Sequence, residues 1–433
     1  MQSRTTGASS IVEAADAKSL PATTRCRACG GDVVVVIDLG QQPPGGSFPL
    51  PDEALALGMR LRLGVCHSCG LTQLADSSPP EADDPAGPTP LSSATVGAHA
   101  RRFVDDLIRR GVASPTSRTL SLASHGGHLG TILGEKAVPV TVLDPVGERI
   151  RRFADAGVPA IRGGFDESPP PDTEHLGLFD LIVDFYLLAH VRDPRSAFVR
   201  IASLLAPTGT LVCEFDHLLA TVEGGQWDAI RHGHNSYLTL SWLAREAQDV
   251  GLSVIDAVPQ PVYGGALRVF VGANRDASPA VSQIERREAD ALLGAPSGLA
   301  PLRDAVERAR VEVVSYLETA RASAQLVVGY GAPARSITFL NALGVGPDLL
   351  PYVVDRSPGK HGRVVPGVGI PIRPVEVLLE DPPAEILVLT WDLIDEVRVA
   401  LAPVVDRGSR LLVALPRLAD VTGGVPRDIG VGR

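Results

Sequence analysis

Four of the five cysteines occur in two pairs whose spacing suits a bound metal ion. Cys26 and Cys29 form one C-x2-C pair, Cys66 and Cys69 form the other, and a glycine follows each pair. Two such pairs supply four thiolates, which is the closed tetrahedral shell of structural zinc. Because the protein fills every position, this ion would stabilise the fold and take no part in catalysis. We therefore expect a small β-rich zinc module over residues 22–75; two unrelated pairs or redox dithiols are the alternatives.

A second feature is a glycine turn that follows one predicted strand and begins a predicted helix. It contains Ser124, Gly126 and Gly127, and Asp144 ends the next predicted strand. Paired glycines let a ligand approach the backbone, a helix start offers N–H groups, and a carboxylate at the second strand suits the hydroxyls of a ribose. These residues predict a nucleotide-type ligand, and the alternative is an ordinary tight turn with a surface aspartate.

A third feature is the turn Gly-Tyr-Gly-Ala at residues 329–332, whose backbone N–H groups could face an anion. Its G-x-G-x-x-A pattern alone would suggest a dinucleotide, with Asp355 as the nearest acidic partner. A nicotinamide-dependent oxidoreductase is therefore one alternative for the whole protein. Cys213 lies in a buried-strand pattern and is expected to be a core thiol.

The elements that must position these residues fall into several domains, since 433 residues are too many for one core. Strand and helix patterns alternate through residues 95–275 and again through residues 326–418, which predicts parallel sheets covered by helices. A long charged helix is expected between them, in residues 276–325. The predicted fold class is α/β: the small zinc module, then two doubly wound Rossmann-like domains joined by a helical segment.

Charge and hydropathy narrow the class of protein further. The formal net charge is −10, which argues against non-specific nucleic-acid binding and leaves anionic ligands to local basic pockets. No apolar run has the length of a membrane span, and the first residues lack the apolar stretch of a secretion signal. We expect a soluble cytoplasmic protein, a monomer or weak oligomer, without nucleic-acid or membrane partners.

Four stretches of sequence together resemble a known family. They are the two cysteine pairs with DLGQQP between them and GLTQL after them, LLAHVRDP (187–194) leading into LLAPTGTLVCEFDHLL, RHGHNSYLTL (231–240) with YGGALRVF (263–270), and the run GYGAPARSITFLNALGVGPDLLPYVVDRSPGKHG (329–362). From about residue 26 to residue 415 the chain resembles the S-adenosylmethionine (SAM)-dependent C-methyltransferases that act on nucleotide-linked keto-deoxysugars. Members of that family have a zinc module, a SAM-binding domain and a C-terminal α/β domain.

The resemblance implies a cofactor and a reaction. The implied SAM-binding residues are Ser124, Gly126, Gly127 and Asp144. C-methylation beside a ketone removes a proton from carbon and holds the resulting enolate, which then takes the methyl group. His234 matches the family's active-site histidine and is the predicted base, while His232 or Tyr237 would donate a hydrogen bond to the oxyanion. Without the resemblance, the two histidines would be interpreted as flanking a loop.

The resemblance also implies a substrate, a nucleotide-linked keto-deoxysugar of antibiotic-type biosynthesis, bound between the two α/β domains. The predicted substrate-binding residues are Arg231, Gly265, Arg268 and Gly331. Arg231 would either stabilise the enolate or hold a phosphate.

This chain departs from the family pattern where the chemistry lies. The first SAM loop lacks the usual acidic residue and Asn-Asp pair, and Arg231 and Gly233 replace a tyrosine and a glutamate. The tyrosine-rich segment that precedes the first helix is missing as well. The alternative hypothesis is therefore a degenerate relative that binds a sugar nucleotide but no longer transfers methyl, or that catalyses another enolate-based reaction such as epimerisation.

Overall fold

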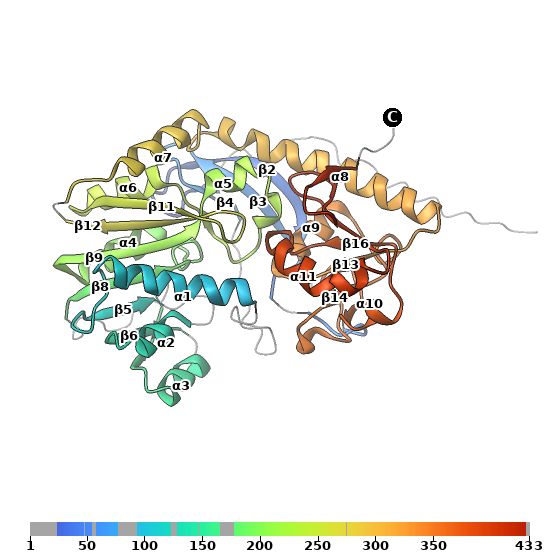
Figure 1. Cartoon of the computed structure of the whole chain (residues 1–433). Helices are drawn as coiled ribbons and strands as arrows, with labels where there is room; N and C mark the ends of the chain where they lie inside the picture. The colour runs from blue at the N-terminus through green and yellow to red at the C-terminus, as the bar shows by residue number, and fades with distance from the viewer. Residues whose placement is uncertain are drawn as a thin grey trace, which may run out of the picture.

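The computed structural model describes residues 24–46, 48–53, 58–76, 93–122, 128–145, 147–164, 177–273 and 275–429. These residues form three sheets, and Figure 1 shows two of them side by side, each with its own helices. Two helices lie along the top of that view: α7 (Pro279–Asp290) over the half with the second sheet, and the long helix α8 (Ala300–Ala322) from the middle over the half with the third sheet. Strands β2 and β3 lie between the two halves. The predicted α/β class with a β-rich module is confirmed.

The first sheet is small and antiparallel, in the order β1-β2-β3-β4-β10. Its strands are β1 (Thr24–Arg25), β2 (Asp32–Gln42), β3 (Met59–Cys66), β4 (Thr72–Leu74) and β10 (Ser236–Tyr237). Buried and partly buried side chains alternate along the middle of β2, because one face of the strand packs on the core. Strand β10 comes from a distant part of the chain, so residues 22–75 do not form this sheet alone.

The second sheet has the order β11-β12-β9-β8-β5-β6-β7 and is parallel except for β12, which runs antiparallel to both neighbours. Its strands are β5 (Thr119–Leu122), β6 (Val140–Asp144), β7 (Ala160–Arg162), β8 (Phe179–Phe185), β9 (Leu205–Asp216), β11 (Ser253–Gln260) and β12 (Ala266–Gly272). Its helices are α1 (Ala94–Arg109), α2 (His128–Glu135), α3 (Gly147–Asp155), α4 (Pro194–Ser203), α5 (Leu218–Glu223) and α6 (Leu240–Asp249). Strand order reverses between β5 and β8, which is where open α/β sheets bind ligands at their carboxyl ends.

Helix α1 illustrates how the sequence builds these layers. The Ser93 side chain caps it by accepting a hydrogen bond from the Val96 N–H. His99, Phe103 and Leu107 follow at intervals of four and are all buried, so one face of the helix packs on the sheet. Burying a phenylalanine of this kind contributes about 2 kcal/mol.

The third sheet has the order β15-β14-β13-β16-β17-β18-β19, with the first five strands parallel and the last two antiparallel. Its strands are β13 (Val327–Tyr330), β14 (Val353–Asp355), β15 (Ile372–Pro374), β16 (Glu385–Val388), β17 (Arg410–Val413), β18 (Ala419–Asp420) and β19 (Arg427–Asp428). Its helices are α9 (Ala334–Leu343), α10 (Val377–Glu380) and α11 (Ile394–Val405). Its strand order reverses between β13 and β16, as expected of a doubly wound domain.

The expected single long helix between these domains is wrong. The chain forms α7 (Pro279–Asp290), a 3-10 turn at Pro296–Leu299, and then α8. The break has a local cause: Gly294 takes a φ of 96°, which a helix does not allow, and Pro296 follows it closely.

The zinc-module sheet and the C-terminal domain share one apolar core. The cluster includes Ile37 and Leu63 from the first sheet, Leu302 from α8 and Val353 from the third sheet. At the same place the rings of Trp227 and Phe339 stack with centroids 5.3 Å apart. The three predicted modules are therefore packed together, although the predicted domain limits themselves stay a prediction.

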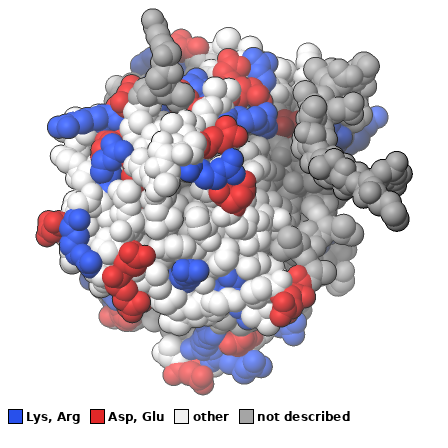
Figure 2. Space-filling model, turned by 90° about the vertical axis from the view of Figure 1, so that its right-hand side faces the viewer, with Lys and Arg blue, Asp and Glu red and all other residues white. Residues whose placement is uncertain are grey.

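Among the described residues, no helix combines the length and the apolar character that crossing a membrane requires. Figure 2 shows the face of the molecule on the side of the C-terminal domain. Basic and acidic side chains are interspersed there around an uncharged central area.

Candidate functional site

The four predicted zinc ligands lie close together where β1 and β3 of the first sheet end and in the turns that follow these strands. Their four sulfurs lie within 4.8 Å of one another. The Cys26–Cys69 and Cys29–Cys66 sulfurs are 3.7 Å and 3.5 Å apart, close to the about 3.8 Å edge of a tetrahedral zinc–thiolate shell. The donor set therefore fits a structural zinc ion.

Hydrogen bonds support the ionised form of one ligand. Gln73 Nε2 donates to Cys26 Sγ at 3.0 Å, and the Ala28 N–H donates to the same sulfur at 3.4 Å. Hydrogen bonding by Cys69, together with Gln73, lowers the pKa of the Cys26 thiol to about 4 although burial acts in the opposite direction. A thiolate is the form that binds zinc.

The histidine-containing stretch 231–237 is joined to the zinc module. Ser236 pairs with Gln73 in the β4–β10 ladder. His232 is buried, and its Nε2 lies 3.2 Å from Gln42 O and 3.3 Å from Met59 O, both in the first sheet. This side chain therefore links the stretch to the zinc module, and it is not among the residues of the cavity described next.

A cavity of about 400 Å³ lies between the second sheet and the C-terminal domain. Residues from both contribute to its wall: Ser93, Val96, Tyr186, Asp216, Arg231 and Tyr263 from one side, and Tyr330, Gly331, Pro333, Ala334, Arg335, Asp355, Arg356, Ser357, Lys360, Thr390, Asp392, Leu393, Glu396 and Val397 from the other. Of the predicted site residues, Arg231 and Gly331 line this cavity, whereas His232, His234, Tyr237, Gly265 and Arg268 do not.

Two tyrosines of the cavity have an unusual backbone conformation. Tyr186, directly after β8, has a φ of 68°, and Tyr263 has a φ of 54°. Their rings meet edge to face with centroids 5.4 Å apart. A left-handed backbone costs about 1–2 kcal/mol at a residue with a side chain, and such strain is concentrated at functional sites. Sequence reasoning missed Tyr186, because nothing in its sequence surroundings indicates a left-handed conformation.

His234 lies behind the cavity wall. It is 1% exposed, and its Nε2 is 3.6 Å from the Oδ2 of Asp216, which does line the cavity. Burial alone would raise the pKa of the Asp216 carboxyl, but the hydrogen bond and charge of His234 hold that pKa below its usual value. Asp216 was not identified from the sequence, because it lies at the end of β9 and far along the chain from the histidine.

Tyr237 has its hydroxyl group in a local network. It donates to Ala229 O at 3.1 Å and accepts from the Arg231 N–H at 3.2 Å. Its ring contacts the His234 ring, with centroids 4.6 Å apart. Tyr237 thus contributes to holding both Arg231 and His234 in place.

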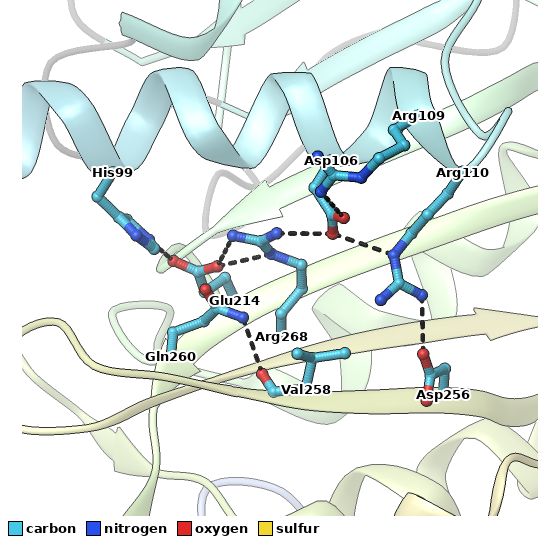
Figure 3. Close-up of polar contacts among 9 residues, drawn as sticks. All are labelled: His99, Asp106, Arg109, Arg110, Glu214, Asp256, Val258, Gln260 and Arg268. Carbon is cyan, nitrogen blue, oxygen red and sulfur yellow. Dashed lines mark hydrogen bonds and ion pairs between the residues drawn. The ribbon is translucent and has the colours of Figure 1, made fainter.

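Arg268, predicted to bind substrate, instead takes part in a buried network (Figure 3). The Arg268 side chain is 2% exposed and donates to Glu214 at 2.9 Å and to Asp106 at 3.0 Å. The Glu214 carboxylate also bonds His99 Nε2 at 2.5 Å and accepts from the Tyr186 hydroxyl at 3.3 Å. Figure 3 shows that these groups join α1 to the sheet. Tyr186 is the member of this network that lines the cavity. Arg268 therefore supports the cavity wall and does not contact the cavity itself.

The two halves of the cavity are held together by charged contacts. The Arg335 guanidinium binds both carboxylate oxygens of Asp228, at 2.8 Å and 3.1 Å, and the Trp391 indole N–H donates to the same carboxylate at 2.9 Å. Nearer the start of α1, the Glu396 carboxylate accepts from the hydroxyls of Ser93 and Thr95, at 3.0 Å and 2.8 Å. Both groups of contacts connect the second sheet's domain to the C-terminal domain.

The glycine turn of the C-terminal domain is closed by its own side chains. Asp355 accepts the Ala332 N–H at 2.7 Å and the Ser357 N–H at 2.8 Å, and Lys360 Nζ donates to Ala332 O at 2.7 Å. In a dinucleotide site, the carboxylate at the position of Asp355 binds the hydroxyls of a ribose, but here it is already bonded to the backbone. The arrangement therefore does not favour the nicotinamide alternative.

The predicted SAM-binding residues are only partly described. Ser124, Gly126 and Gly127 lie outside the described residues. Asp144 ends β6 at the carboxyl edge of the second sheet, is fully buried and is bonded by Arg149 Nε at 2.8 Å. A carboxylate at this strand end is the acceptor that a ribose requires, but that of Asp144 is buried and already paired, so its contact with SAM stays a prediction.

Gly265, predicted to bind substrate, has a structural reason to be glycine. Its φ is 127°, and a Cβ atom there would lie 2.5 Å from the Cβ of Ala220. Its carbonyl accepts the His217 N–H at 3.1 Å. Its substrate contact stays a prediction.

Comparison with known proteins agrees with this organisation. Three family profiles match in chain order: a zinc binding domain (residues 26–82), a methyltransferase domain (residues 96–257) and a C-methyltransferase C-terminal domain (residues 261–416). The C-methyltransferase NovU of Streptomyces niveus is 28% identical over 403 residues, which is 90% of this chain and 95% of that protein.

Two solved structures resemble part of the chain. Magnesium protoporphyrin IX methyltransferase ChlM of Synechocystis PCC 6803 has a TM-score of 0.33 and 14% identity, over 41% of this chain and 83% of that one. The glycopeptide N-methyltransferase MtfA has a TM-score of 0.32 and 13% identity, over 40% of this chain and 94% of that one. At these scores the two structures add nothing to the assignment.

The domain profiles and the arrangement of the four cysteine sulfurs define the chain as a SAM-dependent methyltransferase with a zinc-binding module. It belongs to the C-methyltransferases in which a zinc-binding domain precedes the methyltransferase domain and a C-terminal domain follows it. The family, SAM and zinc predictions are confirmed.

Proposed function

We propose that the protein transfers a methyl group from SAM to the carbon beside the ketone of a nucleotide-activated keto-deoxysugar, through an enolate. The observation that carries this proposal is the cavity of about 400 Å³, whose wall combines phenol groups, a carboxylate paired with a histidine, and cationic side chains. Similarity to the C-methyltransferase NovU supports carbon as the methyl acceptor.

Proton abstraction needs a base, and the enolate oxygen needs fixed hydrogen-bond donors. The base belongs to the pair of Asp216 and His234, at 3.6 Å. The predicted donors His232 and Tyr237 have their polar atoms at backbone carbonyls. We therefore assign the role of enolate donor to the phenol of Tyr263 in the cavity wall, because the Tyr186 hydroxyl already donates to Glu214.

The diphosphate of the sugar nucleotide needs cationic partners. Arg231, Arg335, Arg356 and Lys360 contribute to the cavity wall. Arg335 and Lys360 are themselves bonded to carboxylates, which fixes their position but reduces their net charge. Arg231 projects from the histidine-containing stretch, so we propose that it contacts an anionic part of the substrate, and that Gly331 lets the substrate approach the backbone.

When bound, SAM supplies an electrophilic methyl group. Its proposed holders are Asp144 and the loop with Ser124, Gly126 and Gly127. The chain's own contribution is to hold the sugar carbon and the base in one orientation and to keep water out of the cavity. Holding reacting groups in this way accounts for much of the barrier lowering in reactions between two bound molecules.

The test is incubation of the purified protein with methyl-deuterated SAM and thymidine- or guanosine-diphosphate-linked keto-deoxyhexoses. We expect a product in which a CD3 group replaces one hydrogen of the sugar, and exchange of the α-proton when the sugar and protein are placed in heavy water. Omitting SAM should abolish the mass gain and leave the exchange. If the protein forms neither the methylated sugar nor the sugar with an exchanged α-proton, the proposal is wrong.

A further inference from the structure

Tyr263 begins a turn whose backbone is held in an unfavourable conformation. Its φ of 54° lies in the left-handed region, and φ stays positive at the two residues that follow, Gly264 and Gly265. A left-handed backbone costs about 1–2 kcal/mol at a residue with a side chain, and it persists only where surrounding groups fix it. The phenol of Tyr263 lines the cavity. The groups that fix this backbone therefore determine where the phenol lies.

One of these groups comes from the C-terminal domain. Arg335 lies in the first turn of α9, and its Nη1 donates a hydrogen bond to the Tyr263 carbonyl at 3.2 Å. The Gly264 backbone also packs against this domain, because a Cβ atom there would lie 2.6 Å from Trp391 Cη2. Tyr263 itself lies between β11 and β12 of the second sheet. The contact from Arg335 therefore crosses from one domain to the other.

Arg335 is itself fixed in position. Its guanidinium binds both carboxylate oxygens of Asp228, and its Cζ lies 4.8 Å from the centroid of the Trp391 ring. The side chain is 14% exposed. A guanidinium carries five donors in a planar fork, so it binds Asp228 and the Tyr263 carbonyl at the same time, whereas a lysine ammonium is a point charge on a flexible chain. Arginine thus suits this position better than lysine.

Gln226 holds the same turn from within the domain of the second sheet. Its Nε2 donates to Gly264 O at 2.7 Å, and its Oε1 accepts from Arg335 Nη2 at 3.5 Å. Gln226 is buried. The turn therefore lies between two fixed side chains, and Arg335 is the hydrogen-bond donor that the C-terminal domain contributes.

We propose that Arg335 is a positioning residue that acts through Tyr263. By binding the Tyr263 carbonyl, it keeps the backbone in the conformation that places the phenol in the cavity wall, where the phenol donates a hydrogen bond to the enolate oxygen. This inference rests on the proposed function, which gives Tyr263 that role. It follows that the enolate site is complete only when the C-terminal domain is docked.

The protonation of the phenol agrees with this role. Burial raises the pKa of the Tyr263 hydroxyl above its ordinary value, so the phenol keeps the proton that it must share with the enolate oxygen.

The first test needs no substrate. Labelling with 3-fluorotyrosine gives one 19F NMR signal for each of the six tyrosines, and Tyr263→Phe identifies the signal of Tyr263. In Arg335→Lys, which can keep an ion pair with Asp228, we expect this signal to shift or broaden. Glu396→Gln is the matched control, because Glu396 also joins the two domains but does so at the start of α1. A Tyr263 signal that stays in place in Arg335→Lys, or that moves equally in both variants, overturns the inference.

The second test measures exchange of the α-proton of the same keto-deoxyhexoses in heavy water without SAM. Tyr263→Phe should lower the exchange rate by about 100-fold, the usual effect of losing one donor to an oxyanion. Arg335→Lys should lower it about 10-fold when Tyr263 is present, since a displaced group loses much of its effect. In the Tyr263→Phe background the same substitution should lower the rate by less than about threefold, because two residues that act through one contact are not additive.

The outcomes separate the inference from the proposed function. Equal losses from Arg335→Lys in both backgrounds would show that Arg335 acts independently of Tyr263, and an unchanged rate in Tyr263→Phe would show that the phenol is not the enolate donor; either result makes the inference wrong. Should Arg335→Lys fail to fold, Arg335→Gln is measured in the same two backgrounds. If the unmodified protein does not exchange the α-proton, the proposed function fails, while the 19F signals still report whether Arg335 positions Tyr263.

Discussion

Gln73 contacts a predicted zinc ligand with its side chain and the histidine-containing stretch 231–237 with its backbone. Its Nε2 atom donates to Cys26 Sγ at 3.0 Å, and its backbone pairs with Ser236 in the β4–β10 ladder. Ser236 lies two residues after His234. The zinc module therefore does more than stabilise itself: it supports the segment that holds the histidine beside Asp216.

Loss of the metal should consequently affect catalysis as well as stability. In Cys66→Ser, which removes a fully buried ligand, we expect zinc content to fall from about one ion per chain toward zero, Tm to fall, and methyl transfer to decrease. Cys213→Ser is the matched control, because Cys213 is an equally buried cysteine outside the metal group. Metal analysis that finds zinc retained in Cys66→Ser would contradict the assignment.

Asp228 should be a main contact between the two domains. Asp228→Ala leaves the Arg335 guanidinium and the Trp391 indole N–H without their shared acceptor, and breaking such a buried pair costs about 3–5 kcal/mol. We expect a large fall in Tm and a raised KM for the proposed sugar nucleotide. The exposed pair of Arg287 and Glu223 gives the comparison: Arg287→Ala should cost less than about 1 kcal/mol. Equal effects of the two substitutions would argue against a domain contact at Asp228.

Gly331 should be needed both for its conformation and for its lack of a side chain. It has a φ of 88°, and a Cβ atom would lie 2.6 Å from Thr390 Cγ2 in the cavity wall. Gly344 has a φ of 68° with nothing within 4 Å of a Cβ atom. We expect Gly344→Ala to lose about 1–2 kcal/mol of stability and Gly331→Ala to lose more, because its Cβ atom also displaces Thr390. Only Gly331→Ala should raise KM for the proposed sugar nucleotide, several-fold. Steady-state kinetics of the two variants test this, and an equal KM in both would contradict a role of Gly331 in the cavity.

The stability of the protein should depend on the protonation of Asp184. Burial raises the pKa of this carboxyl to about 7, against an ordinary value of about 3.9 in the unfolded chain. Between these pH values the folded state keeps a proton that the unfolded state has lost, so stability contributed by this group falls as pH rises from about 4 to about 7, and falls no further above that.

Asp184→Asn should therefore remove this part of the pH dependence. Tm of the variant minus Tm of the unmodified protein should increase from pH 5 to pH 7 and then level off. Asp180→Asn, on the exposed face of the same strand, controls for exchanging a carboxyl for an amide. A difference in Tm that does not change with pH would mean that Asp184 is ionised in the folded protein.

Spacing along the chain was enough to identify the zinc ligands and the alternating domains. A C-x2-C pair closes on a metal ion within a single turn, so its geometry is local and visible in the sequence. Strand and helix patterns are also local, which is why the two doubly wound sheets could be predicted. The break between α7 and α8 was missed because the charged pattern continues on both sides of Gly294 and Pro296.

The residues of the candidate site could be predicted from the sequence only in part. His234 was selected by resemblance, but Asp216 comes from the end of another strand and only the fold brings it within 3.6 Å. The left-handed φ of Tyr186 has no sequence marker, since tyrosine does not favour it. Arg268 was predicted at the substrate because nothing in its neighbours revealed that Glu214 and Asp106 would neutralise it.

The sequence by itself determined which four cysteines suit a metal ion, where strands and helices alternate and which family the chain resembles. Only the tertiary structure decided which side chains face the cavity and which support its wall. The physical reason is that metal knuckles and element periodicity depend on neighbours along the chain, whereas the environment of a carboxylate or a phenol depends on strands and helices that meet only after folding.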